Sequence, residues 1–142
     1  MLDKKSESGR SMLEIIGVMG IMGLITAGAF VLIRSGRETQ RRSAINDTVS
    51  SIVTGIRTLY ADYDDLSSLD GTKALSALSI STTGPNGVTY SVEKVTGNNK
   101  QFQVEIANLS DDDCTVLEAK AWSGSVDGAS CSSTTLTIKY NK

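Results

Sequence analysis

The feature that most constrains this chain is an apolar run of 22 residues, from Met12 to Ile33, which contains a single charged residue, Glu14. As an α-helix rising about 1.5 Å per residue, the run is about 33 Å long, close to the roughly 30 Å of a bilayer hydrocarbon core. A cleaved secretory signal has a shorter apolar run of about 7–15 residues that ends in a small-residue cleavage site, and no such site closes this run. The run therefore predicts one membrane-spanning helix near the start of the chain.

Glu14 lies two residues inside the apolar run, where an ionised carboxylate is costly unless a cation pairs with it. Two cations are candidates. Arg10 lies one helical turn away on the same chain. A free α-amine is the other, and it exists near Glu14 only if the chain is cut just before Arg10, after Gly9.

The junction Gly9-Arg10-Ser11-Met12-Leu13-Glu14, followed by the apolar run, resembles the class III leader junction of type IV prepilins and type II secretion pseudopilins. The resemblance implies that residues 1–9 are a short hydrophilic leader, which prepilin peptidase removes after Gly9. It also implies N-methylation of the new first residue, Arg10, which stands where the family usually has phenylalanine. Glu14 would then be the fifth residue of the mature chain and an assembly residue.

For function, the resemblance implies a structural subunit, a pilin, that is stored in the bacterial inner membrane as a single-pass protein. It would then polymerise with copies of itself into an extracellular type IV pilus. Its other partners would be inner-membrane lipid and the pilus assembly machinery. In the filament, Glu14 would pair with the α-amine of Arg10 on a neighbouring copy. Minor pilins and pseudopilins share this N-terminal third and stay as alternatives, and a singly anchored periplasmic binding module is the alternative from another class.

The proline that the family commonly has within its apolar segment is absent here, because the only proline is Pro85. Four glycines lie along the run instead, at positions 17, 20, 23 and 28. Each lowers the stability of a helix by about 1 kcal/mol relative to alanine, which would make the helix softer. Small residues also allow neighbouring helices to approach closely. The two interpretations are compatible.

Charge is divided unevenly along the chain. Residues 1–60 carry eight basic and five acidic side chains, a net charge of +3, whereas residues 61–142 carry six basic and eleven acidic ones, a net charge of −5. Phosphate binding needs a basic face, so the second half does not indicate a nucleic-acid partner. A basic cluster follows the apolar run and is expected to meet acidic groups of neighbouring subunits; it comprises Arg34, Arg37, Arg41 and Arg42.

Residues 35–60 are predicted to continue the same helix in amphipathic form. They contain no proline, and the apolar positions are spaced by three and four residues at Ile45, Val49, Ile52, Ile56, Leu59 and Tyr63. This spacing is typical of a helix that packs one stripe against a core. The predicted fold class is α+β: a long N-terminal α-helix, membrane-spanning over residues 10–34, packed on a small antiparallel β-sheet as in pilins.

Residues 61–142 are predicted to form the globular part. A long loop over 62–87 contains one or two turns of helix around Leu75 and ends in a turn at 82–87. Alternating apolar residues predict antiparallel strands over 88–92 and 102–106, joined by a Gly97-Asn98-Asn99 turn, and a third strand over 134–140. Residues 110–122 are predicted to form a helix, since Ser110 is a good N-cap and three aspartates follow it. A calcium site at these aspartates is the alternative.

Cys114 and Cys131 enclose 16 residues. A membrane span with a leader places them outside the cytoplasm, where a disulfide persists. A closed loop of this size contributes about 3 kcal/mol in the chain-entropy model. A C-terminal disulfide loop attached to a sheet is similar to the D-region of type IV pilins, and a Cys-bearing helix after a central strand is similar to the type IVb group.

Catalytic patterns are missing from the sequence. The chain has no histidine, no zinc-type cysteine spacing, no phosphate-binding loop and no nucleophile elbow. The expected protein is therefore not an enzyme and needs no cofactor or metal.

Overall fold

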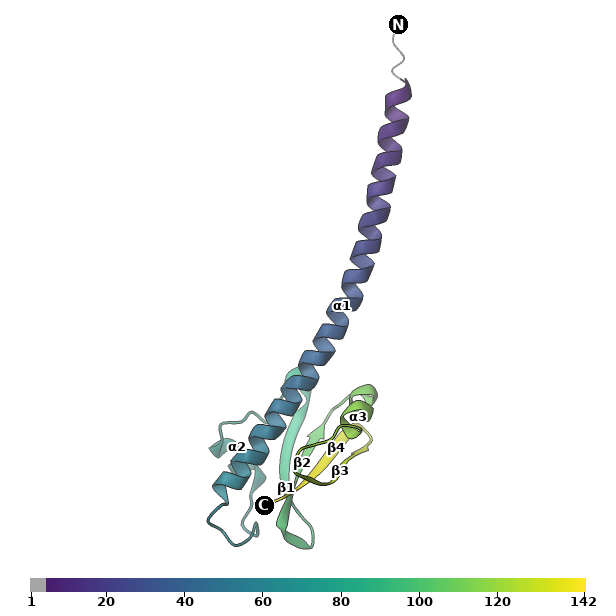
Figure 1. Cartoon of the computed structure of the whole chain (residues 1–142). Coiled ribbons are helices and arrows are strands. Elements are labelled where there is room, and N and C mark those ends of the chain that lie inside the picture. Colours follow the sequence, from purple (N-terminus) through teal and green to yellow (C-terminus); the bar gives the residue numbers. More distant parts are fainter. Residues whose placement is uncertain (1–4) are drawn as a thin grey trace. The chain divides into compact units, whose positions relative to one another are not determined.

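The first structural element is a single long helix. The computed structural model describes the backbone from Lys5 to Lys142 and the side chains from Met12 onward. Helix α1 covers Lys5–Leu59 (Figure 1). The chain divides into two compact units, one ending at Gln40 and the other covering Arg41–Lys142. The predicted long helix is confirmed.

Serine and threonine side chains do not interrupt α1 where its sequence is polar. Hydroxyl groups within the helix donate to the backbone carbonyl four residues earlier at Thr26, Thr39, Thr48, Ser51 and Thr58. Such side chains otherwise compete with the helix by bonding to backbone groups in non-helical conformations. Here their hydrogen bonds stay within the helix, so they do not end it.

Within the second unit, α1 contributes five buried side chains to the core: Ile45, Val49, Ile52, Val53 and Ile56. The first four stripe positions predicted from the sequence are therefore confirmed. The last two are not, because Leu59 is 40% exposed and Tyr63 is 56% exposed. The helix ends at Leu59 and the chain turns away, so the periodicity continues into sequence that is no longer helical.

Four antiparallel strands form one sheet in the order β1-β2-β4-β3. They are β1 (Thr89–Val95), β2 (Asn98–Ala107), β3 (Ser125–Ser132) and β4 (Thr135–Asn141). The predicted strands correspond to β1, β2 and β4. A fourth strand that the sequence did not predict, β3, lies at the edge of the sheet.

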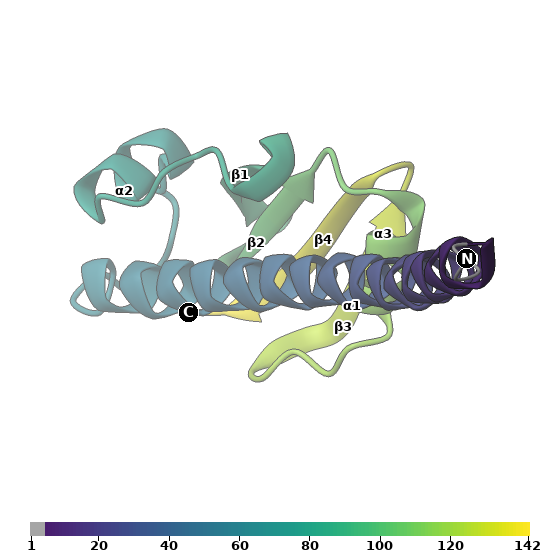
Figure 2. The ribbon, with the colours of Figure 1, turned by 90° about the horizontal axis from the view of Figure 1, so that it is seen from above.

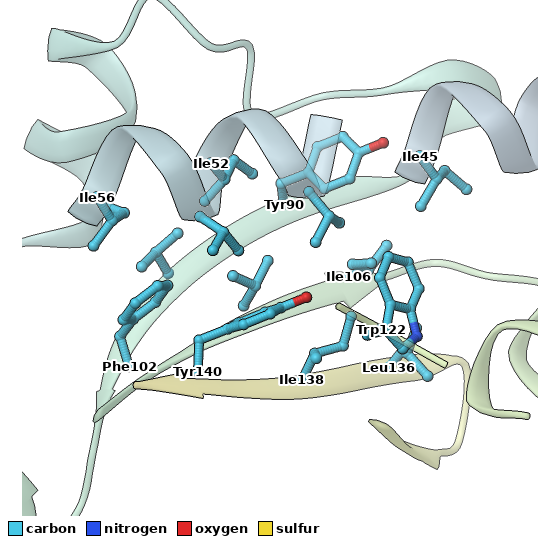
Figure 3. Packing of buried hydrophobic residues seen from close by; sticks show 14 of the residues in the cluster. Ile45, Ile52, Ile56, Tyr90, Phe102, Ile106, Trp122, Leu136, Ile138 and Tyr140 are labelled. Carbon is cyan, nitrogen blue, oxygen red and sulfur yellow. The ribbon is translucent and has the colours of Figure 1, made fainter. Parts of the chain in front are cut away.

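The core lies between α1 and one face of the sheet. Figure 3 shows Ile45, Ile52 and Ile56 above side chains of the strands. In the sheet register, Val104 of β2 lies opposite Val92 of β1 and Ile138 of β4. The buried sheet residues are Tyr90, Val92, Phe102, Val104, Ile106, Leu136, Ile138 and Tyr140. Their alternating neighbours are polar, so only one face of the sheet contributes to the core.

Two short helices flank the sheet. Helix α2 (Gly71–Ala77) lies on the β1 side and has Asp70 as its N-cap (Figure 2). A 3-10 turn, η1 (Pro85–Gly87), confirms the turn predicted before β1. Helix α3 (Asp111–Glu118) contacts β3 and β4.

Helix α3 has the predicted N-cap but is shorter than expected. The Ser110 side chain accepts from the backbone N–H of Asp113. The helix ends at Glu118, four residues before the predicted end at Trp122. The Trp122 Nε1–H donates to the Leu117 carbonyl oxygen at 2.9 Å, so this side chain folds back over the end of the helix.

Candidate functional site

The apolar part of α1 is exposed on every side of the helix. Of the 17 large hydrophobic side chains that are exposed in the described part of the chain, 14 lie between Met12 and Ile33, and the other three are Leu59, Tyr63 and Val116. Within the segment, exposure of these side chains ranges from 53% at Ile15 to 77% at Leu24. A helix that is apolar all round needs lipid or other apolar protein surface around it. One helix of this chain is therefore long and apolar enough to span a membrane.

Glu14 lies on this apolar surface, beside Ile15, Val18, Met19 and Met22. Among the side chains from Met12 to Lys142, none forms an ion pair with Glu14. Gly9 and Arg10 lie within the backbone of α1. The Arg10 side chain is outside the described residues, and so is leader residue Lys4. Removal of residues 1–9, methylation of Arg10 and the role of Glu14 stay predictions.

The four glycines of the apolar segment make no close contacts inside the described chain. A Cβ atom added at position 17, 20, 23 or 28 would meet nothing within 4 Å. These positions are thus open to close approach by another helix, and both interpretations of the glycines stay open.

Two members of the basic cluster have a partner in their own chain. Arg42 Nε donates to Asp113 Oδ1 at 2.9 Å, and Arg41 forms an ion pair with Asp113 Oδ2. Asp113 is 1% exposed, while the arginine side chains are 20% and 29% exposed. The expectation that the whole cluster meets acids of neighbouring subunits is therefore corrected for Arg41 and Arg42.

Asp113 also receives a hydrogen bond from its own helix cap. The Ser110 hydroxyl donates to Asp113 Oδ2 at 2.7 Å and accepts from the Asp113 backbone N–H at 3.3 Å. The sequence distinguishes Asp113 only as one of three acids at a helix start. The sequence signal for the bond to Ser110 is the spacing, because an acidic side chain three residues after the cap can reach back to the cap residue. No group of three metal-ligating side chains occurs in the part of the chain that was described.

The predicted disulfide joins Cys114 of α3 to Cys131 of β3, with a Cα–Cα distance of 5.9 Å. The Cys131 backbone N–H donates to Glu118 Oε1 at 3.1 Å, which gives the edge strand a second link to α3. Cys114 directly follows Asp113. The disulfide therefore fixes the helix that holds the carboxylate against Arg41 and Arg42.

Comparison with protein-family models, with characterised protein sequences and with solved structures finds no match for this chain.

Proposed function

We propose that this protein is a type IV pilin-like structural subunit, stored in the inner membrane of a bacterium and polymerised into a helical pilus through its apolar helix. The observation that carries the proposal is the combination on one helix of an exposed apolar segment that contains one acid, Glu14, and a buried apolar stripe. The large hydrophobic side chains of residues 12–33 are not buried by any part of the described chain. Residues 45–56 of α1, in contrast, contribute buried side chains to the core of the globular unit. The first segment needs apolar surroundings, which a bilayer supplies before assembly and other copies supply afterwards.

The role proposed for Glu14 follows from the cost of an unpaired charge in apolar surroundings. Cleavage after Gly9 would create an α-amine on Arg10. In a filament core, this amine on one copy would pair with the Glu14 carboxylate of a neighbour. A misplaced copy would leave both charges unpaired, and breaking a buried pair costs about 3–5 kcal/mol, so the pair would set the axial register.

The experiment compares Glu14→Ala with a matched control, Glu38→Ala, which removes an exposed acid from the same helix outside the apolar segment. Sheared filaments are quantified against the amount of full chain in the membrane. The proposal expects Glu14→Ala to abolish filaments while the membrane level is kept, and Glu38→Ala to assemble normally. Undiminished assembly of Glu14→Ala would contradict the proposed role.

Minor pilins and secretion pseudopilins remain the alternatives within the same class. The disulfide between Cys114 and Cys131 favours a pilus subunit, because pseudopilins seldom need one. Copy number distinguishes a major pilin, which is abundant, from a minor one. A singly anchored periplasmic module gives Gly9 and Glu14 no special role, so Gly9→Val would leave its chain length and function unchanged.

A further inference from the structure

A groove of about 410 Å³ runs along the globular unit between α1 and the segment that follows α3. Its walls come from three elements of this unit. They are Asn46, Ser50, Val53, Thr54 and Arg57 of α1, residues 120–123 after α3, and Tyr140 of β4. Figure 3 shows Trp122 and Tyr140 on the sheet side of the core, below α1.

The groove carries two positive charges and no negative one. Its lining includes Arg57 and Lys120 but neither aspartate nor glutamate. Arg57 donates to the backbone oxygens of Asn141 and Gly124, at 3.1 and 3.5 Å. Lys120 donates to Asn46 and lies 4.7 Å from the centre of the Trp122 ring. These partners are all neutral, and no ion pair among residues 12–142 includes either cation. The groove thus offers an uncompensated basic surface beside an aromatic one.

The loop that follows α1 has the complementary chemistry. Asp62, Tyr63 and Asp64 are consecutive in the sequence, and all three residues are exposed to solvent. Outside residues 12–33, only three large hydrophobic side chains of the described chain are exposed. Tyr63 is the one in this loop, and Leu59 is the last residue of α1 before it. We call residues 62–64 the acidic loop. An exposed aromatic ring between two carboxylates is suited to a site that combines cations with an aromatic wall.

Three other acids, Asp111, Asp112 and Asp65, have a local role in their own chain. Asp111 and Asp112 lie in the first turn of α3, where the helix dipole favours negative charge. Asp65, next to the acidic loop, accepts from the Ser67 N–H at 2.9 Å, and hydrogen bonds from Ser67 lower its pKa. Among the described side chains, Asp62 and Asp64 form no ion pair.

We infer that the groove binds the acidic loop of a second copy of this chain, with Lys120 and Arg57 facing Asp62 and Asp64. This inference rests on the proposed function, in which many copies are packed together. Groove and loop are different patches of one molecule, so the contact is head-to-tail. A head-to-tail contact forms a ring if its rotation closes and an open helical array if it does not, and the proposed filament requires the open array.

Cross-linking between two full-length variants tests the contact directly. Asp62→Asn/Asp64→Asn retains Lys120, and Lys120→Gln retains the acidic loop. When both are co-expressed, a carbodiimide-formed amide between Lys120 and Asp62 or Asp64 can join only two different copies. Peptide mass spectrometry of membranes and of sheared filaments is expected to detect this amide. Each variant expressed alone is expected to give none, and Lys139, exposed on the opposite face of the sheet, serves as the control amine.

Each outcome decides between the two proposals. The amide in sheared filaments supports both, and the amide in membranes of cells that make no filaments supports the contact alone. Filaments without the amide overturn the contact and leave the pilin proposal intact. Absence of the amide, together with absence of filaments from the parent chain, would overturn both.

Charge reversal gives an independent measurement. Lys120→Glu is expected to lower sheared filament at least tenfold at an unchanged membrane level, whereas Lys139→Glu is expected to change it less than twofold. Adding Asp62→Lys to the Lys120→Glu chain gives the introduced glutamate a cationic partner on the next copy, while Asp64 stays opposite Arg57, and is expected to recover most of the filament. Normal assembly of Lys120→Glu, or no recovery in the combined variant, would contradict the inferred contact.

Discussion

Arg42 Nε on α1 lies 2.9 Å from Asp113 Oδ1 on α3, although 71 residues separate the two in the sequence. Arg41 pairs with the other oxygen of the same carboxylate. The pair lies at the start of the globular unit, which begins at Arg41. Two cations and one buried acid thus hold the first turn of α3 against α1, and the disulfide holds the same turn against β3.

Asp113→Asn is expected to lower the free energy of unfolding by about 3 kcal/mol. Breaking a buried ion pair costs about 3–5 kcal/mol, and the low end applies because Arg41 and Arg42 retain some access to water. The measurement is denaturant unfolding of the full chain in detergent, followed by the fluorescence of the single tryptophan, Trp122. Asp112→Asn is the matched control on the exposed side of α3 and should change stability by less than about 1 kcal/mol, the usual contribution of an acid at a helix N-terminus.

Loss of the disulfide is expected to cost about 3 kcal/mol, the value for a loop of about this length in the chain-entropy model. The Cys114→Ser/Cys131→Ser double variant is compared with the oxidised chain in the same unfolding experiment. Adding reductant should destabilise the parent chain by a similar amount and leave the double variant unchanged. An unaffected parent after complete reduction would show that the cross-link does not limit unfolding.

Gly71→Ala is expected to destabilise the globular unit by about 1–3 kcal/mol, the usual cost of overpacking. A Cβ atom at Gly71 would overlap the Val92 carbonyl oxygen, because the start of α2 lies directly against β1. The Val92 carbonyl belongs to the backbone of β1, so it cannot move aside as the end of a flexible side chain can. Gly97→Ala is a useful comparison, since position 97 has open space and only its φ of +85° opposes a side chain. Equal stability of Gly71→Ala and the parent would contradict this packing.

Alkaline pH should weaken the fold through Tyr140. Burial raises the pKa of this phenol to about 12, whereas an unfolded tyrosine has a pKa of about 10. The unfolded chain therefore loses this proton first. The stability that depends on it is complete below about pH 10 and is lost as pH rises toward 12, by about 1.4 kcal/mol per pH unit. The measurement is the free energy of unfolding as a function of pH, recorded together with phenolate absorbance. Tyr140→Phe should reduce the loss of stability per pH unit.

Sequence patterns predicted the elements whose chemistry is local. The apolar run, the stripe from Ile45 to Ile56 and the alternation around Val104 each follow from helix or strand periodicity, and all three elements are present. The Cys114–Cys131 pairing followed from the compartment expected for a chain with one membrane span. Ser110 was identified as a cap because serine before acidic residues is a strong start signal.

The features that the sequence did not predict depend on contacts between distant segments. Strand β3 carries mostly small and polar residues, is interrupted by a bulge between Val126 and Ala129, and forms a strand because β4 and α3 lie beside it. The pairing of Asp113 with Arg41 and Arg42 joins residues about 70 positions apart, so no local pattern reveals it. The Arg57–Lys120 groove likewise needs three separate segments to be brought together.

The most direct test of the pilin proposal is the intact mass and N-terminal sequence of the protein recovered from cell membranes, with and without Gly9→Val. The proposal predicts that the parent chain begins at Arg10, with or without an added methyl group, and that the variant retains residues 1–9. A chain beginning at Met1 in both would contradict the leader pathway and leave a singly anchored domain in its place.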